Sequence, residues 1–213
     1  MNYRELLYKN ALNAISDLYE KSKWNPDVDL FRIHDIINSV NENQFSSKEW
    51  LVSKLLPFID KKVNNIAVLG SWYGLISLLL REQLETNPYI HNVDSDPETA
   101  RFAKLLFQGM ENDRTYCIIE DAEEWVFDNI QKCDIIINTS CEHMEAEDLL
   151  LMTRMKAPNT LVCFQGNNYH EIQSHINTHD SLDEFVDSLG LRKVEWKGSL
   201  DAGKYERYMV IGK

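Results

Sequence analysis

Apolar residues recur at helical spacing through the first 62 residues of the chain. The clearest series comprises Leu6, Leu7, Ala11, Ala14, Ile15 and Leu18. A second helix is expected at residues 30–40, and the sequence SSKE at residues 46–49 has the form of a capping box that opens a third. Pro57 is expected to end that third helix or to lie near its end. The pattern therefore predicts a helical segment at residues 1–62.

From residue 63 onward, short apolar runs alternate with helical patterns. The first run, at residues 66–69, is bounded by Asn and Gly, as is typical of a buried parallel strand. Strands are predicted at residues 66–69, 89–93, 115–119, 133–138 and 160–165, and helices at residues 74–84, 97–108, 122–130, 146–155 and 181–189. This alternation indicates right-handed βαβ units and a parallel sheet.

The end of the chain follows a different pattern. Two strand-like runs, at residues 191–197 and 205–211, are separated by a linker too short to hold a crossover helix, so the pair is expected to be antiparallel. We therefore predict an α/β fold, a three-layer Rossmann-like sandwich. Its mostly parallel seven-stranded sheet would carry an antiparallel C-terminal hairpin and additional N-terminal helices. The expected division is a helical cap at residues 1–62 and a domain at residues 63–213.

The composition of the chain limits which binding partners and which cellular compartment are expected. The net charge is −12 and the basic residues are scattered, which argues against nucleic acid as a partner. The polar N-terminus does not read as a signal peptide, and no apolar run is long enough to cross a bilayer, so no membrane association is expected. The cysteines lack metal-ligand spacing and indicate reduced thiols in a cytoplasmic protein: Cys117, Cys133, Cys141 and Cys163.

Candidate ligand-binding residues lie at the strand ends, because ligands of open parallel sheets bind outside the carboxyl ends of the strands. The first strand is followed by Gly70, Ser71, Trp72, Tyr73 and Gly74. Glycines here let the backbone pass close to a ligand, or simply form a tight turn between strand and helix. Asp94 lies 24 residues after Gly70, where nucleotide-binding folds hold a ribose diol. Asp96 is expected mainly to cap the next helix.

The third and fourth strand ends carry further polar groups. Asp121 and Ala122 follow the third strand, where a carboxylate is placed to bind an adenine amino group or to cap a helix. Asn138 opens the most polar strand end, which contains Glu142 and His143. A carboxylate next to an imidazole suits acid–base chemistry, and the alternative is a helix cap with a solvated loop.

The fifth strand leads into a segment rich in amides and histidines. His175 and His179 share the i, i+4 spacing of a helix, but no third ligand is obvious. We therefore expect an exposed polar loop and helix here, and no metal site.

Together these strand ends resemble the class I S-adenosylmethionine (SAM) dependent methyltransferases over residues 64–213. NNIAVLGSWYGLISLL is similar to the glycine-rich first motif of that family, HNVDSDP to its second and EDA to its third, while DIIINTSCEHM takes the place of its fourth. The terminal hairpin matches the antiparallel last strand of the family. Two departures are Trp72 in place of the middle glycine and Val68 where an acid is common.

The resemblance implies SAM as cofactor and assigns roles to individual residues. Gly70, Ser71, Trp72 and Gly74 would pass beneath the methionine and ribose parts, and Asp94 would hold the ribose hydroxyls. Asp121 and Ala122 would meet the adenine, and Asn138 would face the sulfonium and the methyl acceptor. Trp72 and Tyr73 are expected either to stack on the ligand or to fill the pocket.

The predicted function is methyl transfer from SAM to a small-molecule or protein acceptor, with His143 as base and Glu142 assisting it. The alternatives are an aminocarboxypropyl transferase that uses SAM, a non-catalytic binding or assembly protein of the same fold, and a nicotinamide-dependent oxidoreductase, which the hairpin disfavours. The N-terminal helices are expected to cover the pocket or to contribute to a homodimer. Trp24 and Trp50 are expected to pack in the core rather than to form substrate walls.

Overall fold

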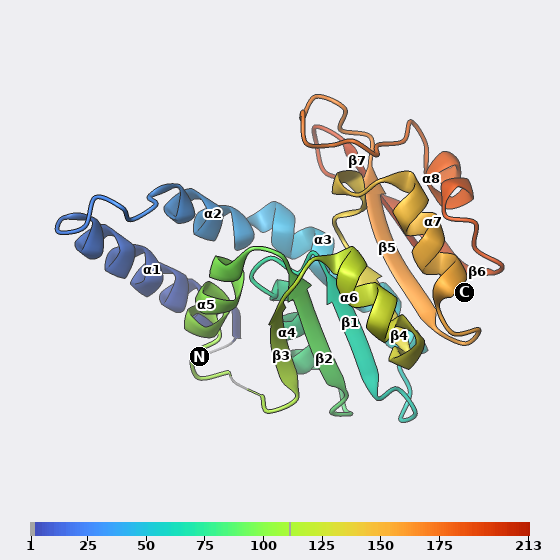
Figure 1. Ribbon diagram of the computed structural model, residues 1–213, viewed down its shortest axis with the longest axis horizontal. Helices are drawn as coiled ribbons and strands as arrows, with labels where there is room; N and C mark the ends of the chain where they lie inside the picture. The colour runs from blue at the N-terminus through green and yellow to red at the C-terminus, as the bar shows by residue number, and fades with distance from the viewer. Residues whose placement is uncertain (1–2, 111) are drawn as a thin grey trace.

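The computed structural model describes residues 3–110 and 112–213, which form a seven-stranded sheet with helices on both faces (Figure 1). The strands are β1 (Asn65–Leu69), β2 (Tyr89–Asp94), β3 (Thr115–Ile119), β4 (Ile135–Asn138), β5 (Leu161–Asn167), β6 (Val194–Asp201) and β7 (Glu206–Gly212). They lie in the order β3-β2-β1-β4-β5-β7-β6. The first five strands pair in parallel, and β7 lies antiparallel between β5 and β6. The predicted fold class is therefore confirmed.

Alternating side chains of β1 show how the two helical layers are attached. Ile66 and Val68 belong to one buried cluster, and Ala67 and Leu69 belong to the other, because successive residues of a strand point to opposite faces. The first cluster includes residues of α1 (Tyr3–Ser22), α2 (Phe31–Ser39), α3 (Glu42–Leu55), α4 (Leu75–Gln83) and α5 (Pro97–Leu106). The second includes residues of α6 (Ala122–Asn129), α7 (Ala146–Met155) and α8 (Leu182–Ser188).

The N-terminal helices are bound to the sheet layer by specific contacts. Asn10 Nδ2 donates to the carbonyl oxygens of Leu106 (2.8 Å) and Gln108 (2.9 Å), which satisfies carbonyls at the end of α5. At the other end, Trp50 of α3 meets Trp196 of β6 edge-on, with ring centroids 5.7 Å apart. Helices α1 to α3 thus extend the layer formed by α4 and α5. The division into residues 1–62 and 63–213 stays a prediction.

The start of α3 differs from the prediction. Asn41 is its N-cap, and the Asn41 side chain accepts a hydrogen bond from Gln44 N (2.9 Å), whereas residues 46–49 lie inside the helix. The predicted capping box is therefore wrong. An earlier start places Phe45, which is 1% exposed, on the buried face of the helix. The helix ends at Leu55 and continues as a short 3₁₀ turn that contains Pro57, as predicted.

Three other regions of the structure also differ from the sequence prediction. Trp50 packs against the first core cluster, as predicted. Trp24 lies in the turn beyond α1 and is 87% exposed, so the prediction that it packs in the core is wrong. The segment that contains His175 and His179 forms turns and no helix, because its backbone amides bond to Glu142 and Asn167 carbonyls. The strand β6 begins and ends later than predicted, which shortens the hairpin loop to residues 202–205.

None of the helices within residues 3–110 and 112–213 combines the length and apolarity needed to cross a bilayer.

Candidate functional site

The turn after β1 is held in an unusual backbone conformation. Gly70 (φ +57°), Trp72 (φ +50°) and Gly74 (φ +75°) all have positive φ, a region that L side chains rarely adopt. A Cβ atom at Gly70 would lie 2.8 Å from Ser140 Oγ, so the turn also packs closely against the loop after β4. The glycine at position 70 is therefore required by conformation and by space.

Asp94 connects this turn to the end of β2. Its Oδ2 accepts a hydrogen bond from Trp72 N (2.8 Å), and its Oδ1 accepts one from Asp96 N (3.1 Å). Burial raises the pKa of Asp94, while these two backbone hydrogen bonds act in the opposite direction. The structure thus brings together two of the predicted cofactor-binding segments.

Asp96 caps α5, as expected. Its Oδ1 accepts a hydrogen bond from Glu98 N (2.9 Å), and its other oxygen pairs with the guanidinium of Arg32 in α2. The pair ties α2 to the end of β2, next to the turn. Arg32 was missed by sequence reasoning, because nothing in the pattern of α2 predicts a partner in α5.

Asp121 lies at the start of α6. Its exposed carboxylate accepts hydrogen bonds from Glu123 N (2.8 Å) and Glu124 N (3.4 Å) and so caps the helix, of which Ala122 is the first residue. The backbone also approaches the second strand end, since Glu120 N donates to Asp94 O (3.1 Å). The capping role is confirmed, and the adenine contacts of Asp121 and Ala122 stay predictions.

Trp72 limits the space around the β1 turn. It lies against Tyr73, with ring centroids 5.5 Å apart and an angle of 25° between the rings. Ser71 and Trp72 line two small cavities, the larger of which has a volume of about 10 Å³. Ligand pockets generally measure about 300 Å³ or more, so neither cavity holds a nucleoside in this conformation.

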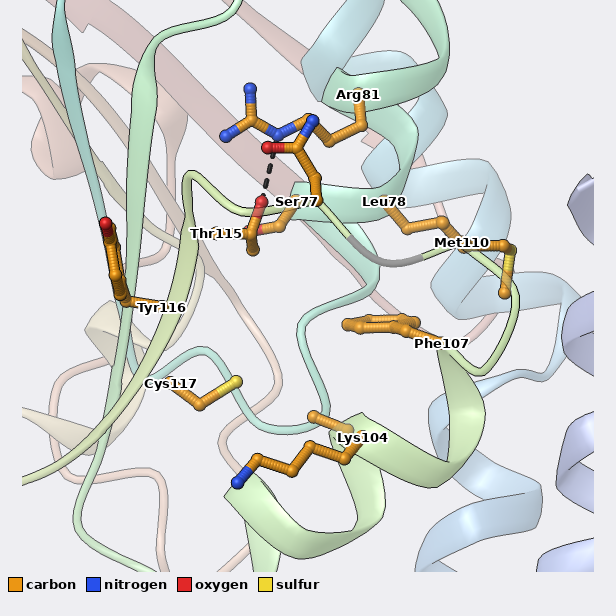
Figure 2. A pocket seen from close by; sticks show the side chains of 11 residues that line it. Ser77, Leu78, Arg81, Lys104, Phe107, Met110, Thr115, Tyr116 and Cys117 are labelled. Carbon is orange, nitrogen blue, oxygen red and sulfur yellow. Dashed lines mark hydrogen bonds between the residues drawn. The ribbon is translucent and has the colours of Figure 1, made fainter.

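A much larger cavity, of about 610 Å³, lies elsewhere, between α4, α5 and β3 (Figure 2). Its walls include Leu78, Phe107 and Tyr116, and one rim is fixed by the hydrogen bond from Arg81 Nε to Thr115 Oγ1 (2.9 Å). None of the residues predicted to bind a ligand lines this cavity.

Asn138 shapes the loop after β4. It is fully buried, its Oδ1 accepts a hydrogen bond from Ser140 N (2.8 Å), and its Nδ2 contacts Met144 Sδ (2.9 Å). The loop then forms a short 3₁₀ turn, η3 (Cys141–His143). Burial raises the pKa of the Cys141 thiol well above its usual value, which argues against a thiolate nucleophile here.

Glu142 is the centre of a buried polar group. Its Oε1 accepts hydrogen bonds from Arg207 Nη1 (2.9 Å) and Asn167 Nδ2 (2.7 Å), which come from β7 and β5. The side chains of Glu142 and Arg207 are only 4% and 12% exposed. Glu142 therefore joins three segments of the chain, and its ion-pair partner is Arg207.

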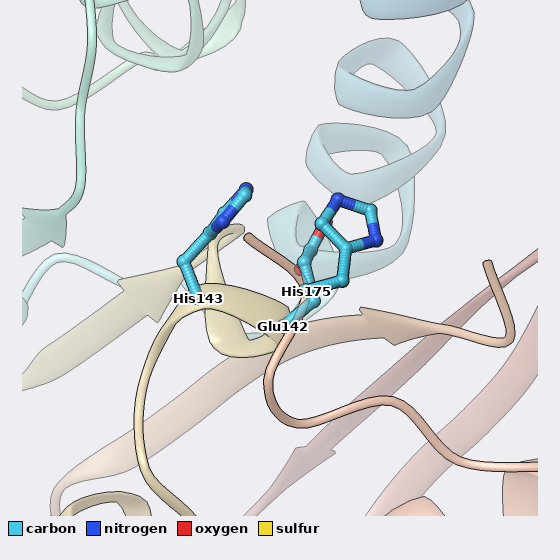
Figure 3. Close-up of side chains that lie close together, drawn as sticks. All are labelled: Glu142, His143 and His175. Atoms are coloured by element: carbon cyan, nitrogen blue, oxygen red, sulfur yellow. The ribbon is translucent and has the colours of Figure 1, made fainter. Parts of the chain in front are cut away.

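His143, next in sequence, is exposed. Its Nδ1 lies 2.9 Å from Ser174 O, and its ring meets His175 edge-on, with centroids 4.8 Å apart. Glu142, His143 and His175 lie close together, and each carries an atom of a type that could bind a metal ion (Figure 3). Sequence reasoning did not place His175 near Glu142 and His143, because the spacing paired it with His179.

Lys48 reaches the same edge of the sheet from α3. Burial, together with the positive charge of Arg207, lowers its pKa to about 7. Its Nζ donates a hydrogen bond to Gln44, and the residue lines the small cavity shared with Ser71 and Trp72. Sequence reasoning placed Lys48 in a helix cap and gave it no functional role.

No protein-family model and no curated protein matches the sequence. Solved structures do match. A SAM-dependent methyltransferase from Agrobacterium tumefaciens aligns over 82% of this chain and 63% of its own, with a TM-score of 0.58 and 15% identity. The N-methyltransferase NodS from Bradyrhizobium japonicum aligns over 82% of this chain and 97% of its own, with a TM-score of 0.62 and 12% identity. The chain has the class I SAM-dependent methyltransferase fold.

A third match includes the N-terminal helices. A mutant of the nicotianamine synthase MtNAS, in complex with S-adenosylmethionine, aligns over 98% of this chain and 72% of its own, with a TM-score of 0.57 and 14% identity. An alignment of that extent takes in α1 to α3. At these identities the matches show the fold, and this chain spans less than two thirds of the Agrobacterium enzyme.

Proposed function

We propose that the protein is a SAM-dependent methyltransferase that acts on a small-molecule or protein acceptor. The observation that carries the proposal is the hydrogen bond between Trp72 N and Asp94 Oδ2. It joins the two segments that resemble the first and second motifs of the family, on a sheet with the order of that fold. The carboxylate of Asp94 keeps further lone pairs for the ribose hydroxyls.

SAM binding on this proposal requires the turn to open. Because the cavities beside Trp72 are too small for a nucleoside, the indole must rotate away from Tyr73 when the cofactor enters. The backbone of the turn then lies beneath the ligand, where a side chain at position 70 or 74 would obstruct it. Asp121 and Ala122 would lie near the adenine, and Asn138 near the sulfonium.

The acceptor would enter at the ends of β4 and β5. Methyl transfer is an in-line displacement, so the residues here need to align the acceptor and exclude water. A nitrogen or oxygen acceptor also needs a base, and we assign this role to Lys48 in preference to His143. Lys48 is partly buried, lies beside the β1 turn, and is largely neutral above pH 7, whereas His143 faces outward.

Calorimetry with SAM and S-adenosylhomocysteine tests the proposal. The unaltered protein should bind both, and Asp94→Ala should weaken binding by about tenfold or more, the equivalent of one lost hydrogen bond to a charged group. Asp113→Ala, an exposed acid outside the strand ends, is the matched control and should bind normally. If the unaltered protein binds neither compound at millimolar concentration, a non-catalytic role for the fold is favoured.

Transfer of the aminocarboxypropyl group of SAM is a second candidate. It is favoured by the alignment with nicotianamine synthase, which covers 98% of this chain and so includes the N-terminal helices, whereas the two methyltransferase alignments cover 82% of it. The released co-product separates the two reactions. Methyl transfer leaves S-adenosylhomocysteine, whereas aminocarboxypropyl transfer leaves 5′-methylthioadenosine, and mass spectrometry of a turnover mixture with candidate acceptors distinguishes them.

A further inference from the structure

We propose that Glu142, His143 and His175 bind a divalent transition-metal ion. Each residue offers one ligand atom, and these atoms all lie within 4.8 Å of one another. Figure 3 shows the two imidazoles side by side, with the carboxylate next to His175. Two imidazoles and one carboxylate form a donor set that suits Zn²⁺ and Fe²⁺ and does not suit Mg²⁺, which prefers oxygen ligands alone.

The hydrogen bonds of the two histidines leave Nε2 of each ring available as a ligand atom. His143 Nδ1 lies 2.9 Å from Ser174 O, and His175 Nδ1 lies 2.8 Å from Tyr169 O. A carbonyl oxygen only accepts hydrogen bonds, so both Nδ1 atoms carry the proton. In the neutral imidazole Nε2 then holds the free lone pair. Metal-binding histidines are oriented in this way, by donation from the other ring nitrogen to a carbonyl or carboxylate.

Glu142 supplies a second, independent observation. The residue is 3% exposed, and its Oε1 is occupied by Arg207 and Asn167. Its Oε2 is buried and has no hydrogen-bond partner within the described part of the chain. A buried carboxylate oxygen without a partner is costly, and a metal ion at this position would satisfy it.

The loop that carries His175 is already attached to Glu142. The carbonyl oxygen of Glu142 accepts hydrogen bonds from Ile176 N (2.9 Å) and Asn177 N (3.2 Å). A tetrahedral ion with bonds of about 2.0–2.1 Å places its ligand atoms about 3.3 Å apart, so the cluster must contract on binding. Small adjustments of the exposed His143 and the partly exposed His175 would provide this contraction while their Nδ1 hydrogen bonds are kept.

Three protein ligands leave one position of a tetrahedral ion open to a water molecule or to a donor atom of another molecule. The cluster lies at the ends of β4 and β5, the edge at which an acceptor would enter. The metal site is defined by its own side chains and does not depend on SAM binding, so either proposal can fail without the other.

The test is calorimetric titration of the untagged, chelator-treated full chain with Zn²⁺, since a polyhistidine tag would itself bind the ion. We expect one ion per chain with micromolar affinity or better, and no comparable binding of Mg²⁺. His143→Ala and His175→Ala should each weaken Zn²⁺ binding by at least about tenfold, the lower end of the loss seen when a supporting group of a metal site is removed. His170→Ala is the control, because His170 is exposed in the same loop and pairs with Asp180 instead.

A second measurement guards against misfolded variants. The absorption spectrum of bound Co²⁺ in the unaltered protein should show coordination by fewer than six ligands, and His175→Ala should lose that spectrum while keeping its unfolding transition in metal-free buffer. Zn²⁺ affinity that is unchanged in both histidine variants would overturn the proposal. So would an equal loss in His170→Ala, or only millimolar binding by the unaltered protein.

Discussion

The turn after β1 and the loop after β4 lie at the same edge of the sheet, but different interactions hold them. The turn depends on backbone conformation, with positive φ at Gly70, Trp72 and Gly74. The loop depends on a buried ion pair between Glu142 and Arg207, which come from distant parts of the chain. The difference indicates that the turn should be sensitive to added atoms, whereas the loop should be sensitive to lost charge.

The largest expected effect is at the ion pair. Arg207→Met leaves the Glu142 carboxylate buried without its counter-ion and should lower the free energy of unfolding by about 3–5 kcal/mol. Lys197→Met breaks an exposed ion pair with Asp183 and should lower the free energy of unfolding by less than about 1 kcal/mol. Urea denaturation of both variants measures the contrast. Similar losses in the two would show that burial of the Glu142 pair has little energetic consequence.

The next effect concerns the turn. Gly70→Ala forces an L side chain into the left-handed region, which should lower the free energy of unfolding by about 1–2 kcal/mol. The added Cβ also meets Ser140, so the total loss should be about 2–3 kcal/mol. Gly203 also has a positive φ (+81°), but no atom lies within 4 Å of its Cβ position. Gly203→Ala should therefore show the conformational cost alone. Equal losses would mean that the contact with Ser140 relaxes freely.

Lys48 gives a smaller effect that depends on pH. Its folded-state pKa of about 7 lies below the ordinary 10.5, so the unfolded chain binds this proton more tightly, and stability should rise as pH increases from about 7 to 10.5. Lys48→Met should raise the free energy of unfolding by about 1–2 kcal/mol near pH 7. This is less than the pKa shift alone implies, because part of the Lys48 side chain contacts water. The gain should shrink toward pH 10.5. Thermal unfolding across this range measures it, and a gain independent of pH would contradict the assignment.

The smallest effect separates the two roles of Asp121. Asp121→Ala should destabilise the protein by about 1 kcal/mol through loss of the helix cap, whereas Asp121→Asn keeps a good cap and should be nearly neutral. If Asp121 also binds adenine, Asp121→Asn should weaken S-adenosylhomocysteine binding while stability is retained. Unchanged affinity in Asp121→Asn would leave the residue as a cap alone.

The sequence identified most of the strands and the β1 turn because their signals are local. An apolar run such as residues 66–69 can bury both faces only inside a sheet, and Gly70 and Asp94 follow strands directly. The antiparallel hairpin was likewise predictable from linker length. These features depend on neighbouring residues, which a single sequence displays.

The cluster after β4 could be predicted only in part. Glu142 and His143 were recognised as an adjacent pair, but Arg207 and His175 come from segments far along the chain, and no local pattern connects them. The i, i+4 spacing of His175 and His179 suggested a helix, whereas hydrogen bonds to distant carbonyls hold this segment in turns. Lys48 was assigned to a cap because residues 46–49 have the form of a capping box, whereas the helix is in fact capped by Asn41.

Strand β7 runs in the direction opposite to the first five strands of the sheet, so it presents its beginning where they present their ends. Arg207 pairs with Asn167 at the end of β5, and Gly212 pairs with Val162 near its start. The hairpin loop therefore lies at the edge of the sheet where the parallel strands end, and there Tyr205 lies parallel to Tyr169 with ring centroids 5.2 Å apart. A fluorophore attached at Lys213 would lie at the opposite edge of the sheet, whereas one attached in the hairpin loop would lie at the edge that carries the ends of β4 and β5.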